Sequence, residues 1–312
     1  MDINNKIKHI ITFRYNRLIK NLGTSSLFYK IKFQILLPLG IFDQGFLNEK
    51  LDKNWIARID DVKSCPDNLQ IDRVPNAGAV KNGKQIMHNG IAITVGGYYG
   101  GPITQMLKVN KGVHEPQEEL AFHKVLSSIP ENATMLELGS YWSFYSIWFQ
   151  KKIKGAKTHM VEPEVVNLLY GKNNFRINNV SGKFTNAYVG KESRNINGAE
   201  TITVDGYMTE NNISFLDILH SDIQGFELDM LYGAANAIKS KSIGYFFIST
   251  HGNDIHYKCL SFLKDNNYAI VCNADENETF SFDGLIVAKS PNYKGINNIP
   301  ISLKTKLTTQ IH

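Results

Sequence analysis

From about residue 116 onward, short apolar runs alternate with longer amphipathic stretches along the chain. Runs such as 134–138 and 243–249 are mostly apolar, as strands are when helices cover both faces of a parallel sheet. The stretches between these runs carry apolar residues at helical spacing. The pattern predicts strands over 134–138, 158–161, 183–189, 201–204, 215–221, 243–249, 268–272 and 284–288, and helices over 118–128, 143–153, 164–178, 227–239 and 257–266. This alternation indicates an α/β fold in three layers (α/β/α), with a Rossmann-like, mostly parallel sheet in the middle.

The last two predicted strands have no helix between them. We therefore expect 268–272 and 284–288 to pair as a hairpin, which makes the last strand antiparallel in an otherwise parallel sheet. In sheets of this kind, ligands bind beyond the carboxyl ends of the strands. Residues that directly follow predicted strands are therefore the first candidates for a functional site.

The chain before residue 116 has a different pattern. Residues 1–80 mix amphipathic, helix-like stretches with loop composition, and we interpret them as a basic, largely helical arm. Within 81–115, a strand-like run over 85–95 precedes a turn rich in glycine and tyrosine, which predicts a small hairpin-bearing accessory segment. Residues 116–312 then form the main domain.

Basic charge is concentrated in the N-terminal arm. The chain of 312 residues has a formal net charge of +5 at pH 7, and seven of its basic side chains lie within residues 1–35 beside a single acidic one. These basic residues are Lys6, Lys8, Arg14, Arg17, Lys20, Lys30 and Lys32. A nucleic-acid partner is disfavoured because the remaining chain lacks a basic cluster. The arm is expected either to pack on the body as a solvated helix or to make peripheral contact with an anionic membrane.

Composition places the protein among ordinary globular chains. It is 43% hydrophobic and 20% charged, which argues against disordered and fibrous classes. The three cysteines, Cys65, Cys259 and Cys272, are far apart and in no metal-ligand spacing, so no disulfide framework is expected. The chain has no recognisable secretory signal and no unbroken membrane-spanning run. We therefore expect a cytoplasmic protein, which could also lie at the inner face of the membrane if the arm contacts lipid.

Two residues that follow predicted strands suit an adenosine-containing cofactor. Gly139 directly follows the strand at 134–138 and allows a tight turn before the next helix. Glu162 ends the following strand, where a carboxylate can accept two hydrogen bonds from a ribose diol. Bulky residues after Gly139 and the extra acid Glu137 disfavour the pyrophosphate of NAD and suit S-adenosylmethionine, whose amino group is cationic. A purely structural turn is the alternative.

These motifs resemble a known family. The run Leu136-Glu137-Leu138-Gly139-Ser140, together with Glu162, is similar to the first two motifs of class I S-adenosylmethionine-dependent methyltransferases. The run from 215 to 234, with Ser221-Asp222-Ile223-Gln224-Gly225-Phe226-Glu227 at its centre, and the stretch 201–205 before it resemble the FkbM-type branch of these enzymes. The resemblance covers about residues 116–290. One departure is that Tyr141 and Ser143 stand where the family has glycines.

The resemblance implies roles for individual residues and a class of reaction. The residues implied for the cofactor are Glu137, Gly139, Ser140 and Ser143 at the methionyl end, Glu162 at the ribose, and Asn186 and Ala187 near the adenine. FkbM-type enzymes are associated with O-methylation of sugars, polysaccharides and polyketides, so the resemblance implies an O-methyltransferase of bacterial polysaccharide biosynthesis, with a glycan or sugar as substrate. The alternatives are a methyltransferase of a non-glycan small molecule and an inactive Rossmann-like scaffold protein of a glycan-assembly complex.

Asp222, Glu227 and His251 are the candidates for chemistry on the acceptor. Asp222 and His251 each follow a predicted strand, so both should lie at the carboxyl edge of the sheet. His251 could act as a general base toward a hydroxyl, with activity rising through about pH 6–7. Alternatively, Asp222 with Glu227 or His251 could hold Mg²⁺ or Mn²⁺. Structural roles stay open: a helix cap for Asp222 and a favourable helix-dipole contact for Glu227.

Tyr98 and Tyr99 lie in the glycine-rich turn that precedes the main domain. Aromatic rings suit the faces of a pyranose, so we expect both tyrosines to contact the sugar of the acceptor. The stretch 114–119, with one histidine and three glutamates, could cover the cofactor. It could equally be the capped start of a helix with proline in its first turn.

Overall fold

The computed structural model describes residues 26–305, except 38, 40–41, 43 and 197–198. The first five basic residues of the arm therefore lie outside the described residues, and the expected membrane contact of the arm stays a prediction. In the part of the chain that is described, no helix is both long and apolar enough to cross a membrane.

The main domain is built on a seven-stranded sheet in the order β12-β13-β11-β10-β4-β5-β6. Its strands are β4 (Thr134–Leu138), β5 (Lys157–Val161), β6 (Lys183–Thr185), β10 (Leu216–Ser221), β11 (Ile243–Thr250), β12 (Ala269–Ala274) and β13 (Gly284–Lys289). β13 is antiparallel to both of its neighbours, whereas β4, β5, β6, β10 and β11 pair in parallel. The expected terminal hairpin and antiparallel last strand are confirmed.

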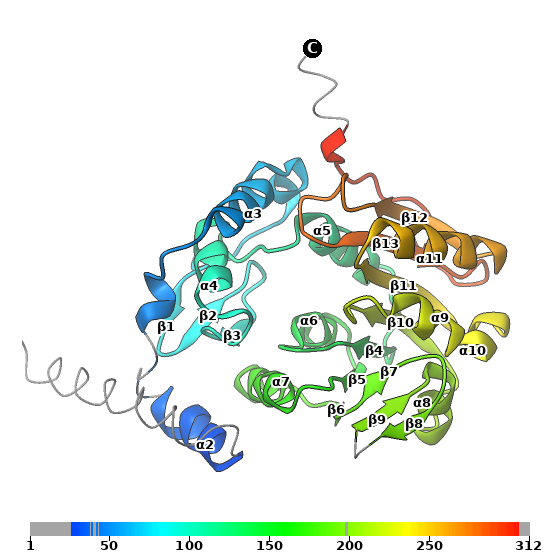
Figure 1. The fold of residues 1–312 in the computed structure, drawn as a ribbon, viewed down its shortest axis with the longest axis horizontal. Helices are drawn as coiled ribbons and strands as arrows, with labels where there is room; N and C mark the ends of the chain where they lie inside the picture. Colours follow the sequence, from blue (N-terminus) through cyan, green and yellow to red (C-terminus); the bar gives the residue numbers. More distant parts are fainter. Residues whose placement is uncertain (1–25, 38, 40–41, 43, 197–198, 306–312) are drawn as a thin grey trace, which may run out of the picture.

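Helices cover both faces of this sheet (Figure 1). One face carries α5 (Pro116–Leu126), α6 (Phe144–Lys152) and α7 (Val165–Ile177), and the other carries α8 (Val204–Glu210), α9 (Glu227–Tyr232), α10 (Ala235–Lys239) and α11 (Asn253–Asp265). Successive strand side chains alternate between the two cores: Met135 packs in the first and Leu136 in the second, as the pleat requires. This confirms the three-layer α/β/α fold with a Rossmann-like, mostly parallel sheet.

The N-terminal part forms an additional layer outside α5, α6 and α7 (Figure 1). It contains α2 (Ser26–Ile31), η1 (Lys32–Leu36), η2 (Gln44–Leu47), α3 (Lys53–Ser64), η3 (Pro66–Gln70), β1 (Val80–Lys81), β2 (Lys84–Ile86), β3 (Ala92–Thr94) and α4 (Gly100–Val109). Of these, α2 and η1 lie beside α7. Met87, Met106 and Leu107 of this layer are fully buried in the same hydrophobic cluster as Phe122 of α5 and Phe247 of β11. The layer is thus part of the main hydrophobic core.

Three segments differ from the sequence-based expectation. The run 85–95 is a hairpin of β2 and β3 rather than one strand, because it turns around Gly90, which has a positive φ of 85°. The run 183–189 breaks after β6, and its end forms β7 (Tyr188–Val189) in a small sheet with β8 (Arg194–Ile196) and β9 (Ala199–Ile202). The helix expected over 227–239 is interrupted at Gly233, whose added Cβ would lie 2.3 Å from the carbonyl oxygen of Gly190.

Candidate active site

A pocket of about 250 Å³ opens where the carboxyl ends of β4, β5 and β10 meet. Its walls include Tyr99, Gly139, Tyr141, Glu162, Val189 and Asp222. A smaller inner cavity of about 20 Å³ shares Gly139, Tyr141 and Asp222 with this pocket and continues to Glu137 and Ser140. A larger cleft of about 520 Å³ lies elsewhere, between the N-terminal layer and α5 and α6, and none of the predicted site residues line it.

The turn after β4 brings its backbone against the neighbouring strand. Gly139 has a φ of +69°, and a Cβ added to it would lie 1.8 Å from the carbonyl oxygen of Asp222, so no other residue fits without moving the backbone. Tyr141 and Ser143, which replace the family's glycines, also have positive φ values of 37° and 59°. The loop thus keeps a backbone that favours glycine although it carries side chains there.

The inner cavity offers polar atoms that lack protein partners. Glu137 is buried, accepts a hydrogen bond from the backbone N–H of Ser146 at 3.2 Å, and has its pKa raised to about 7 by burial, against the nearby charge of His220. The hydroxyl of Ser140 is buried with no hydrogen-bond partner among the described residues. These groups suit the ammonium and carboxylate of a methionyl group. Ser143 is equally buried but does not line either cavity; its hydroxyl faces α7 at Gly171.

Glu162 lies in the pocket wall at the end of β5, and burial raises the pKa of its carboxyl. Its two oxygens accept the backbone N–H groups of Tyr141 at 3.0 Å and Glu164 at 2.9 Å, which fixes the carboxylate at the pocket. Asn186 does not line this pocket: its amide donates to the carbonyl oxygens of Glu162 and Pro163, at 2.9 and 2.6 Å. Ala187 is buried, and the next two residues of β7 form the pocket wall instead.

Asp222 and His251 meet at the carboxyl edge of the sheet. The Nε2 atom of His251 lies 3.4 Å from Oδ1 of Asp222 and 3.2 Å from Oδ1 of Asp283, and its Nδ1 atom lies 2.8 Å from Oε1 of Glu227. Glu227 is fully buried at the start of α9 and also accepts the backbone N–H of Gly225 at 3.0 Å. One imidazole thus joins three carboxylates from three different elements.

Burial and mutual charge set the proton affinity of this group. Burial lowers the pKa of His251, but the hydrogen bond to Glu227 and the charges of Asp283 and Asp222 outweigh it and raise the pKa to about 9. Burial and the neighbouring Asp283 raise the pKa of Asp222 to about 7, against the opposing charge of His251. Burial likewise raises the pKa of Asp283 to about 6. The group therefore exchanges protons near neutral pH.

The side chains expected to hold a divalent cation are not arranged as metal ligands. Among the residues that the structure describes, no group of three or more histidine, cysteine, aspartate or glutamate side chains is arranged to hold a metal ion. The Nδ1 atom of His251 is hydrogen-bonded to Glu227, and its Nε2 atom lies within ion-pair distance of Asp222 and Asp283, so the ring stands between these acids. The geometry does not support Mg²⁺ or Mn²⁺.

Asp283 and Gln224 belong to this group, although the sequence pattern did not single them out. Gln224 lies 2.7 Å from Nε2 of His251, and Asp283 directly precedes β13. Because β13 is antiparallel, its first residue Gly284 pairs with Thr250, the last residue of β11. The amino end of the last strand therefore lies at the carboxyl edge of the others, and the predicted hairpin topology contained the signal that could have identified Asp283.

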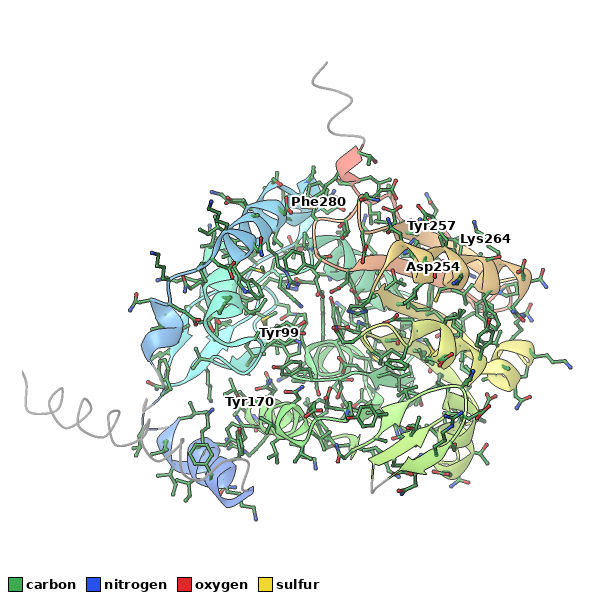
Figure 2. The ribbon with its side chains drawn as sticks, viewed as in Figure 1. Tyr99, Tyr170, Asp254, Tyr257, Lys264 and Phe280 are labelled. Carbon is green, nitrogen blue, oxygen red and sulfur yellow. The ribbon has the colours of Figure 1, made fainter. Side chains whose placement is uncertain are left out.

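Both tyrosines line the pocket, and Figure 2 shows Tyr99 between the N-terminal layer and the main domain. Tyr98 is almost buried and stacks on Trp142 with ring centroids 4.3 Å apart. Tyr99 is 47% exposed and packs against Tyr141 with ring centroids 5.6 Å apart. Of the two, Tyr99 offers the open ring.

Buried glutamates and histidines form a charge network next to the inner cavity. Glu119 is fully buried and binds His114 Nδ1 at 2.5 Å, while accepting the backbone N–H groups of His114 and Glu115 at 2.9 and 3.1 Å. Oε1 of Glu118 lies 2.7 Å from Nε2 of His220, and Oε2 of Glu118 accepts a hydrogen bond from the hydroxyl of Ser249 at 3.0 Å. The stretch 114–119 contains the start of α5 at Pro116, as one of the two expectations has it; its first two residues line the inner cavity, and a role in covering a cofactor stays a prediction.

A comparison with known protein families agrees with the methyltransferase motifs in the sequence. Residues 132–270, a little under half of the chain, match the family described as the methyltransferase FkbM domain, which confirms the resemblance for this region. No curated protein matches the chain.

Solved structures are similar over little more than half of the chain. A precorrin-6y C5,15-methyltransferase from Geobacter metallireducens GS-15 is 13% identical over 55% of this chain and 87% of its own, with a TM-score of 0.39. The M. capricolum protein TrmK, in complex with S-adenosyl-homocysteine, is 13% identical over 55% of this chain and 69% of its own, with a TM-score of 0.39. A SAM-dependent methyltransferase from Aquifex aeolicus is 12% identical over 56% of this chain and 89% of its own, with a TM-score of 0.35.

Proposed function

We propose that this chain, whose residues 132–270 form an FkbM-type methyltransferase domain, is an S-adenosylmethionine-dependent O-methyltransferase that acts on a hydroxyl of a sugar or polysaccharide. One observation carries the proposal. The pocket bounded by Gly139 and Glu162 ends at Asp222, and Asp222 contacts His251 at 3.4 Å. The pocket proposed for the cofactor and an acid–base group thus share one wall.

The residues present fit the proposed cofactor. Glu162 presents a fixed carboxylate for a ribose, and the inner cavity is lined by the carboxyl of Glu137 and by the hydroxyl of Ser140, which is buried without a hydrogen-bond partner among the described residues. Bound S-adenosylmethionine would supply an electrophilic methyl group for an in-line displacement, in which positioning contributes much of the acceleration.

The chain's own residues manage the proton of the acceptor. A hydroxyl is a weak nucleophile, so a neighbouring base must accept its proton as the new bond forms. His251 is held by Glu227 on one ring nitrogen, which leaves the other directed at Asp222 and Asp283. We assign His251 as the base, with Glu227 as the carboxylate that orients its ring, and Asp222 as the catalytic acid beside it, whose charge, with that of Asp283, stabilises the protonated imidazole.

Binding of the cofactor can be measured without knowing the acceptor. By calorimetry, S-adenosylmethionine and S-adenosylhomocysteine should bind saturably, and Glu162→Ala should weaken binding about 10- to 100-fold because a charged hydrogen bond is worth about 1.5–3 kcal/mol. Gly139→Val should abolish binding, because its side chain collides with the backbone of Asp222. A matched control is Glu131→Ala, since Glu131 is exposed, pairs with Lys154 and lies outside this pocket. Equal binding by all variants would remove this site assignment.

The acceptor class is tested by transfer of a labelled methyl group. We expect label on extracted bacterial surface glycan and none on RNA or protein. Label on a non-glycan small molecule would indicate a methyltransferase of such molecules instead. Binding of S-adenosylmethionine without transfer to any of these acceptors would favour the scaffold protein.

A further inference from the structure

Arg58, on the N-terminal helix α3, is a buried cation without a direct partner. Its side chain is only 5% exposed, yet it makes no hydrogen bond or ion pair with the described residues, and its Nε atom is fully buried and unpartnered. Buried arginines are normally paired, because leaving a charge in the interior without hydrogen bonds is unfavourable. A guanidinium in this state is prepared for a ligand.

Aromatic rings hold this guanidinium in place. Its Cζ atom lies 4.3 Å from the ring centroid of Phe282 and 5.2 Å from that of Trp55. Trp55 in turn lies 6.4 Å from Tyr99 and 6.3 Å from Phe282, centroid to centroid. Contacts of this kind stabilise a cation but leave its N–H donors unused.

The arginine lies beside the proposed acid–base group. Phe282 immediately precedes Asp283, whose carboxylate is 3.2 Å from His251. Arg58 is also close enough to lower the pKa values of Asp283 and Glu115 electrostatically, although it bonds to neither. Two rings, those of Trp55 and Phe282, therefore contact the guanidinium, and Tyr99 packs next to Trp55 and lines the pocket that reaches Asp222.

We propose that Arg58, with the rings of Trp55, Tyr99 and Phe282, binds an oxyanion carried by the acceptor, so that the acceptor is an acidic sugar and not a neutral one. This rests on the proposed function. A planar guanidinium matches a carboxylate or a phosphate through two parallel hydrogen bonds, and the rings provide surfaces for a pyranose. The N-terminal layer then contributes specificity, and the methyltransferase domain contributes the chemistry.

The test measures binding to protein saturated with S-adenosylhomocysteine, using three small probes. These are methyl glucoside, methyl glucuronide and glucose 1-phosphate, each followed by calorimetry. We expect the glucuronide to bind about 10- to 100-fold more tightly than the glucoside, as a charged hydrogen bond would give. If the phosphate shows the larger gain, the oxyanion of the acceptor is a phosphate. Equal binding of all three probes would overturn the proposal.

Variants identify the residue responsible. Arg58→Gln should lower the affinity for the charged probe to that for the glucoside. Arg58→Lys keeps the positive charge but cannot form two parallel hydrogen bonds, so it should retain part of the difference in affinity. Lys63→Gln removes an exposed cation from the same helix and should change nothing. If Arg58→Gln instead weakens the binding of S-adenosylhomocysteine by the same factor, the arginine binds the cofactor and the proposal is wrong. If the parent protein binds no S-adenosylhomocysteine, the proposed function itself fails.

Discussion

At the scale of single residues, His251 shows how neighbours change a side chain's chemistry. The sequence alone gives a histidine that titrates at pH 6–7. In the structure, burial is outweighed by Glu227, Asp283 and Asp222, and the pKa of His251 rises to about 9. At neutral pH both ring nitrogens are therefore protonated, and the ring becomes a base only as the pH rises.

We therefore expect turnover to rise with pH toward about 9 instead of levelling off near 7. His251→Ala should lose about 10²–10⁴-fold in turnover. Asp283→Asn removes a negative charge, which lowers the pKa of His251 and moves the rise to lower pH. Rate profiles of kcat/KM, checked by NMR titration of the imidazole, measure both effects. Asp254→Asn, on an exposed residue of α11, serves as the control. A profile complete by pH 7 would assign the proton to another group.

At the scale of elements, the start of α5 depends on charges that lie inside the protein. Glu119 binds the His114 ring and both preceding backbone N–H groups, so one carboxylate caps the helix and pairs a buried cation. Burial lowers the pKa of His114, but Glu115 and Glu119 raise it from 6.5 to about 10. Burial raises the pKa of Glu115, but His114 lowers it from 4.5 to about 2.

The expected consequence is a stability maximum between about pH 4.5 and 6.5. The contribution of His114 is complete below 6.5 and is lost as the pH rises through about 10. The contribution of Glu115 is complete above 4.5 and is lost as the pH falls through about 2. In urea unfolding at pH 5.5, Glu119→Ala should lower the free energy of unfolding by about 3–5 kcal/mol, and by less at pH 9.5.

Glu131→Ala provides the comparison for this prediction. Glu131 is exposed and pairs with the exposed Lys154, so its loss should change the free energy of unfolding by less than about 0.5 kcal/mol. If Glu119→Ala costs no more than Glu131→Ala, the buried network does not stabilise α5.

At the scale of the whole molecule, the N-terminal layer and the main domain share a hydrophobic core. Met106 of α4 and Phe247 of β11 are both fully buried in one cluster. Parts that share a core lose their packing together, so the described part of the chain should unfold as one cooperative unit. The layer that carries Arg58 is thereby held in fixed relation to the catalytic edge of the sheet.

Met106→Ala should therefore destabilise the entire molecule. We expect a loss of about 2–5 kcal/mol, as for other buried methionines, seen as one shifted transition by calorimetry and by circular dichroism. Leu69→Ala, at a position that is 86% exposed, should leave the transition within about 0.5 kcal/mol. Two separate transitions, of which only the first responds to Met106→Ala, would show that the layer folds independently.

The amino-acid sequence by itself determined the alternation of strands and helices, the antiparallel last strand, and the strand-end positions of Gly139 and Glu162. These features follow from local periodicity and turn chemistry, which a short window of sequence contains. Only the tertiary structure decided that Arg58 is buried near His251, and how the charges of Asp222, Glu227 and Asp283 change the pKa of that histidine. Those properties are sums over neighbours that are far apart in the chain, and no local pattern carries them.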